Sequence, residues 1–89
     1  MAVYIVTYDL NKETSRPNIT GEIKKTARWA KLSESSYAIS TDETPEKVYN
    51  RFSKLLDGND NFYVINLRRP YSGQGPKDVN EWLEEHLPR

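Results

Sequence analysis

A single carboxylate stands at the end of the first apolar run of the sequence. The stretch from Val3 to Tyr8 holds only β-branched and aromatic residues, which is typical of a buried strand, and Asp9 follows it directly. Asp9 either takes part in chemistry or only ends the strand. In a structural role, it would accept the backbone amide of Asn11 or Lys12 in an Asx turn.

One carboxylate is too few to hold a metal ion by itself. If the two-fold axis of a homodimer brings Asp9 next to its copy, the two carboxylates would bind a cation or share a proton. Asp9 is therefore the residue most worth testing, with the Asx turn as the structural alternative.

Positively charged side chains near this acid and near a glycine-containing loop are the candidates for binding phosphate. Lys12 and Arg16 follow Asp9 in the next loop, and Arg68 and Arg69 precede the loop PYSGQGP. A further basic group belongs either to a phosphate surface or to a solvated helix face: Lys24, Lys25, Arg28 and Lys31. Because 13 Lys and Arg balance 13 Asp and Glu, any nucleic-acid site has to be a local patch.

The composition excludes several classes of protein. The sequence has no cysteine, so disulfides, thiolate metal sites and thiol nucleophiles cannot occur. It has neither an apolar run of membrane-spanning length nor the pattern of a secretory signal, so we expect no membrane partner and a cytoplasmic location. With 89 residues, we expect one small domain, residues 1–89.

The elements that must position these residues follow from hydrophobic periodicity in the first half of the chain. Ile19, Ile23 and Ala27 recur at four-residue steps and predict a helix after the polar loop that follows Asp9. The sequence WAKLSESSYAIST predicts two short strands joined by a turn at residues 33–36, because serine hydroxyls bond turn backbone readily.

The second half predicts a helix, a strand and a further helix. Thr44 caps the first of these helices, Gly58 ends it, and its buried stripe comprises Val48, Phe52, Leu55 and Leu56. The run NFYVINLRR predicts a strand in which we expect Tyr63 to lie in the core. Pro76 then begins a C-terminal helix.

The resulting order is strand, helix, strand, strand, helix, strand, helix. It predicts an α+β protein, a ferredoxin-like βαββαβ sandwich with an added C-terminal helix. The first two helices would cover one face of the sheet. We expect the third helix and a second copy of the chain to cover the other face.

Several motifs resemble one superfamily. The strand VYIVTYDL with its Tyr-Asp end, and the serine-rich hairpin SSYAIS, are similar to the small CRISPR-associated proteins called Cas-two and to VapD-type ribonuclease toxins. The SinR-family proteins share more, including the start YxVxYDLNKE, which here spans residues 4–13. They also share a late pattern of an aromatic residue, Gly-x-Gly and Trp-Leu, here Tyr71, Gly73, Gly75, Trp82 and Leu83.

This resemblance implies a ferredoxin-like homodimer. In the Cas-two proteins, the aspartate at the end of the first strand lies near its dimer mate and is proposed to hold a divalent metal for phosphodiester cleavage. By position that residue is Asp9. The leading hypothesis is a protein that binds or cleaves RNA or DNA with a metal such as Mg²⁺. The alternative is a non-enzymatic protein-interaction module, which the neutral net charge and the single acid favour.

Overall fold

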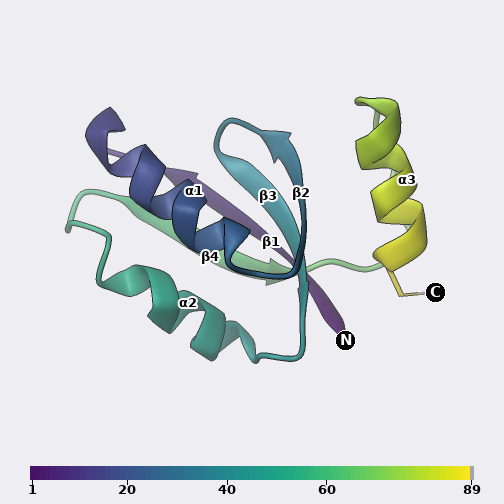
Figure 1. Ribbon diagram of the computed structural model, residues 1–89, viewed down its shortest axis with the longest axis horizontal. Coiled ribbons are helices and arrows are strands. Elements are labelled where there is room, and N and C mark those ends of the chain that lie inside the picture. Colours follow the sequence, from purple (N-terminus) through teal and green to yellow (C-terminus); the bar gives the residue numbers. More distant parts are fainter. Residues whose placement is uncertain (89) are drawn as a thin grey trace.

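The computed structural model describes residues 1–88 as a four-stranded antiparallel sheet with helices packed on it (Figure 1). The strands, in the spatial order β2-β3-β1-β4, are β1 (Ala2–Asp9), β2 (Arg28–Ser33), β3 (Ser36–Thr41) and β4 (Asn61–Asn66). The helices are a short 3-10 turn η1 (Glu13–Ser15), α1 (Arg16–Lys24), α2 (Pro45–Ser53) and α3 (Lys77–His86). The ferredoxin-like α+β fold with an added C-terminal helix is therefore confirmed.

The core lies between the sheet and the pair α1 and α2. Successive side chains of a strand alternate between faces, so β1 directs Tyr4, Val6 and Tyr8 toward these helices. Apolar side chains from both helices and from β3 and β4 complete the core, namely Ile19, Ile23, Tyr37, Ile39, Val48, Phe52 and Phe62. The Phe52 and Phe62 rings stack with their centroids 4.8 Å apart.

An arginine joins the two core helices on their polar side. The Arg51 guanidinium on α2 lies 3.5 Å from a carboxylate oxygen of Glu22 on α1 and 3.2 Å from one of Glu43. It also donates to the Thr26 hydroxyl just beyond α1, at 3.1 Å. The end of α1 is therefore fixed by a charged network as well as by apolar packing.

Three details differ from the sequence-based expectation. The helix α1 ends at Lys24, because the amide of Thr26 bonds the carbonyl of Ile23 and turns the chain, which leaves Ala27 exposed. Likewise, α2 ends at Ser53, and the half-buried Leu55 and Leu56 lie in the turn before Gly58. Tyr63 is not a core residue: it pairs with Thr7 and is 61% exposed.

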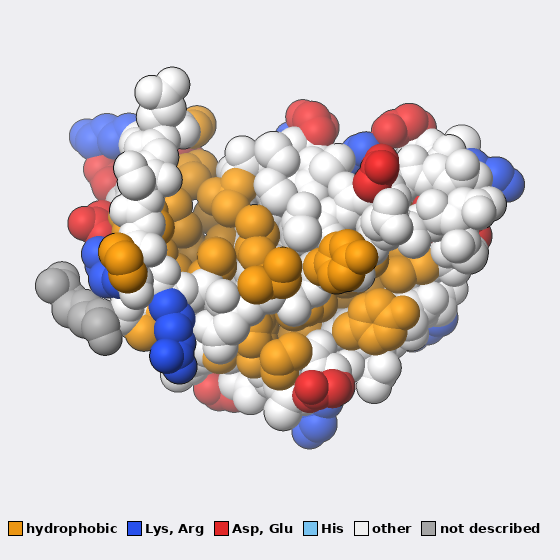
Figure 2. All heavy atoms as spheres, turned by 180° about the vertical axis from the view of Figure 1, so that it is seen from behind, with side chains coloured by type: hydrophobic (Ala, Val, Ile, Leu, Met, Phe, Trp, Pro, Cys, Tyr) orange, Lys and Arg blue, Asp and Glu red, His pale blue; other side chains and the backbone are white. Residues whose placement is uncertain are grey.

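The second face of the sheet is apolar and only partly covered. We call it the open face; alternation assigns to it Ile5, Thr7 and Asp9 of β1, Tyr63 and Ile65 of β4, Ala38 and Ser40 of β3, and Ala30 and Leu32 of β2. Figure 2 shows hydrophobic side chains gathered over this side of the molecule. Helix α3 lies beside β2, whereas Tyr63 and Ile65, at the other edge, remain exposed.

Within residues 1–88, no helix is both long and apolar enough to cross a bilayer.

Truncating the ring at the centre of the core tests this packing. Phe52 is fully buried, so we expect Phe52→Ala to lower the free energy of unfolding by about 3–5 kcal/mol. Tyr49→Ala, on the same helix at a position 44% exposed, is the control and should cost clearly less. Urea denaturation measures both, and equal losses would contradict the assigned core.

Candidate functional site

Asp9 is the last residue of the central strand β1 and lies on the open face. It pairs in register with Asn61 of β4, and both residues are exposed. Its neighbours on the same face are Thr7, and across the ladder Tyr63, so the carboxylate lies at the end of an apolar row. Asp9 is therefore a solvent-facing acid at the rim of a face that is only partly covered.

A different carboxylate holds the loop after β1. The Asn11 amide donates to Oδ1 of Asp60 at 2.7 Å, and the Asp57 amide donates to Oδ2 at 3.0 Å. These two amides, helped by the charge of Lys12, hold the pKa of the Asp60 carboxyl below its usual range. Of the two amides that the Asx turn could use, that of Asn11 is thus bound to Asp60. Within residues 1–88, the Asp9 carboxylate forms no hydrogen bond or ion pair.

The two basic residues that follow Asp9 have different roles. Lys12 is exposed and lies near Asp60. Arg16 is held in place: it forms two hydrogen bonds with Glu13, at 2.8 and 3.1 Å, and donates to the carbonyl of Glu34 in the β2–β3 turn. Its guanidinium also lies 5.8 Å from the centre of the Tyr8 ring. Of this pair, Lys12 has the side chain that is accessible to a phosphate.

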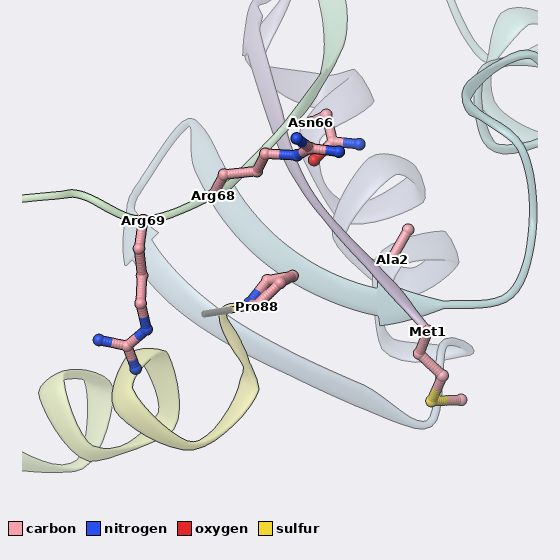
Figure 3. Close-up of a pocket in the computed structure, with 6 residues that line it drawn as sticks. All are labelled: Met1, Ala2, Asn66, Arg68, Arg69 and Pro88. Carbon is pink, nitrogen blue, oxygen red and sulfur yellow. The ribbon is translucent and has the colours of Figure 1, made fainter.

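Arg68 and Arg69 lie at the opposite end of β1 from Asp9. The amide of Leu67 bonds the carbonyl of Val3, so six residues of strand, about 20 Å, separate these arginines from the acid. In Figure 3 they border a cavity of about 460 Å³ together with Met1, Ala2, Asn66 and Pro88. The structure therefore does not bring them to Asp9 within one chain.

The two arginines also differ from each other. Arg68 is exposed and lines this cavity (Figure 3). Arg69 points to α3, where it lies 2.6 Å from the Glu84 carboxylate and donates to the carbonyls of Glu84 and Leu87 at 2.7 and 3.4 Å. Arg69 thus caps the C-terminal end of α3, whose last carbonyls need donors.

The metal-binding capacity of this end of the sheet depends on Asp9. Within the described chain, no group of three His, Asp or Glu side chains lies close enough together to hold a metal ion. Mg²⁺ typically takes only one or two carboxylates and fills its shell with water and substrate phosphate oxygens. An exposed, unengaged carboxylate fits that requirement when a second copy of the chain supplies another.

Sequence reasoning missed the role of Asp60. Its signal was present in the segment DGND, whose two acids flank turn residues: Oδ1 of Asp57 accepts the amide of Asn59 at 2.8 Å. What the sequence could not show is that the same turn approaches the loop after β1, 49 residues earlier.

Comparison with known proteins identifies the fold but no family. No family model matches the chain, and no curated protein matches it. Among solved structures, a hypothetical protein from Thermus thermophilus is similar, with a TM-score of 0.68 and 25% sequence identity over 84% of this chain and 92% of that one. This similarity supports the fold and assigns no activity.

The structural role of Asp60, and the absence of such a role for Asp9, can be tested by measuring the free energy of unfolding. Because the native pKa of Asp60 is depressed, its contribution is present above the unfolded pKa of roughly 4 and is lost as pH falls through the lower folded value. We expect Asp60→Ala to destabilise the protein at neutral pH and Asp9→Ala to change stability little. The difference between wild type and Asp60→Ala should shrink below about pH 4. Equal destabilisation by both variants in urea unfolding would contradict this assignment.

Proposed function

We propose that this protein acts as a homodimer that binds nucleic acid and cleaves its phosphodiester bonds with a divalent metal held between two Asp9 carboxylates. The observation that carries the proposal is the position of Asp9, exposed at the end of the central strand while Asp60 performs the structural task nearby. The resemblance of the first strand, VYIVTYDL, to the Cas-two proteins, in which the aspartate at this position is proposed to hold a divalent metal, supports the same role.

The open face supports the dimer. Tyr63 and Ile65 are 61% and 52% exposed, and they continue the apolar row that contains Ile5. Exposed apolar patches of this kind mark interaction sites, and a self-complementary face suits a two-fold axis. Since Asp9 stands at the rim of the same face, an axis near this rim would place two carboxylates together.

The groups around this acid have defined tasks in the proposed reaction. A bound Mg²⁺ would neutralise phosphate charge and lower the pKa of a water molecule, which supplies the nucleophile. Asp9 and its copy would hold the cation. Lys12 is exposed in the following loop and would bind a phosphate oxygen, whereas Arg16 stays engaged with Glu13 and orders the loop. Arg68, about 20 Å away along the strand, would contact a more distant phosphate.

A second function is favoured by the same exposed side chains. Tyr63 and Ile65 would also suit a non-enzymatic module that binds a protein partner through the open face. The two functions respond differently to salt, because phosphate contacts weaken steeply as salt rises and an apolar interface barely changes.

The cleavage assay targets Asp9. We expect labelled single-stranded RNA or duplex DNA to be cut with Mg²⁺ or Mn²⁺ and not with a chelator. Asp9→Asn should reduce the rate at least roughly a hundredfold, since even the outer partners of metal ligands are worth 10–100-fold. Lys54→Gln, an exposed residue just beyond α2, is the control and should cleave as wild type does. Unchanged cleavage in folded Asp9→Asn would refute the catalytic role.

The proposed dimer interface is tested separately by introducing a lysine into the open face. We expect wild type to sediment as a dimer and Ile65→Lys to sediment as a monomer, because a lysine in an apolar interface would lose its hydration. Asn18→Lys, at an exposed position of α1 on the helix-covered side, is the matched control and should remain dimeric. A monomeric wild type, or an Ile65→Lys protein that stays dimeric, would show that the open face is not the dimer interface.

A further inference from the structure

A groove between the edge strand β2 and helix α3 contains both tryptophans of the chain. Its volume is about 490 Å³, within the range of ligand pockets. Strand β2 contributes Trp29, Ala30 and Lys31, and the start of α3 contributes Pro76, Asp78, Val79 and Trp82. The two tryptophans therefore come from segments more than 50 residues apart and line one cavity.

Contacts behind the groove fix each indole. The Trp29 ring packs against Tyr37 at a centroid distance of 5.9 Å, tilted by 58°. The Trp82 ring stacks on His86 at 4.0 Å and 19°, and Nδ1 of His86 donates to the carbonyl of Trp82 at 2.8 Å. Both tryptophans are half-buried. Each ring is thus held by its neighbours and still presents surface to the groove.

Positive charge lies beside these rings. Nζ of Lys24 is 5.4 Å from the centre of the Trp29 ring, and this lysine forms no ion pair within residues 1–88. Lys31 lines the groove and pairs with Glu34 at 2.9 Å. The acid on the opposite wall, Asp78, accepts the amide of Val79 at 2.9 Å. Lys24 belongs to α1 and lines the neighbouring hollow rather than the groove, so with Lys31 it places positive charge next to the β2 wall of the groove.

We propose that this groove binds unpaired nucleobases of a single-stranded nucleic acid, stacking them on Trp29 and Trp82 while Lys24 and Lys31 contact the phosphates. Aromatic rings next to cations suit a single strand, because each base can stack on a ring and each phosphate linkage carries a negative charge. A duplex keeps its bases paired and stacked, so it cannot enter. The inference rests on the proposed function for the nucleic-acid class, but it does not require cleavage.

The experiment measures tryptophan fluorescence, which reports on this groove because both tryptophans line it. Asp9→Asn protein in chelator is titrated with a single strand of roughly 12 nucleotides, and with a duplex of equal length. We expect the single strand to quench the emission, with weaker binding at higher salt, and the duplex to leave it unchanged. Absent quenching by the single strand, or equal quenching by the duplex, would overturn the proposal.

Matched variants locate the binding. Trp82→Ala should weaken the apparent affinity about tenfold, with Trp29 as the remaining reporter, and Trp82→Phe should restore most of it. Lys24→Gln should weaken binding, whereas Lys54→Gln should not. If Trp82→Ala fails to fold, the affinities of Trp82→Phe and Lys24→Gln decide whether the single strand binds in the groove. If Lys24→Gln and a folded Trp82→Ala both bind the single strand with wild-type affinity, the strand binds elsewhere and the proposal is wrong. If the wild-type protein does not cleave nucleic acid but the single strand still quenches the tryptophan emission, only the proposed nuclease activity is refuted.

Discussion

The register of strand β1 is the constraint on which both the core and the candidate site depend. This strand lies between β3 and β4, and its side chains alternate between the helices and the open face. Tyr4, Val6 and Tyr8 are buried by that alternation, and Asp9 is placed in solvent by it. A slip of one residue would exchange the two sets and bury a charge, so the packing of the core keeps the acid exposed to solvent.

Charged residues that look alike in the sequence have separate tasks in the fold. Arg16, Arg51 and Arg69 each join two segments of the chain by binding carboxylates or backbone carbonyls. Asp60 likewise binds two loop amides. Because these groups are engaged, the side chains accessible to a ligand at the ends of β1 are fewer than the charge count implies. The candidate site is therefore built on Asp9 and Lys12, which are both exposed.

Much of the fold was predictable because it follows local rules. Alternation identified the strands, and the cap of Thr44, whose hydroxyl accepts the Lys47 amide, identified the start of α2. The prediction that Tyr63 lies in the core was wrong because both faces of its strand are apolar. The alternation of side chains therefore does not show which face the helices cover. The position of Asp9 was predictable, whereas the separation of Arg68 from it depends on antiparallel pairing across the sheet.

Metal binding measured by calorimetry tests the central claim, that two Asp9 carboxylates form one cation site, most directly. Mn²⁺ is titrated into wild type and Asp9→Asn without nucleic acid, with both proteins folded and dimeric. We expect one bound ion for every two wild-type chains and loss of that binding in Asp9→Asn. Equal binding by both proteins would contradict it, because the cation would then occupy a site that does not include this acid.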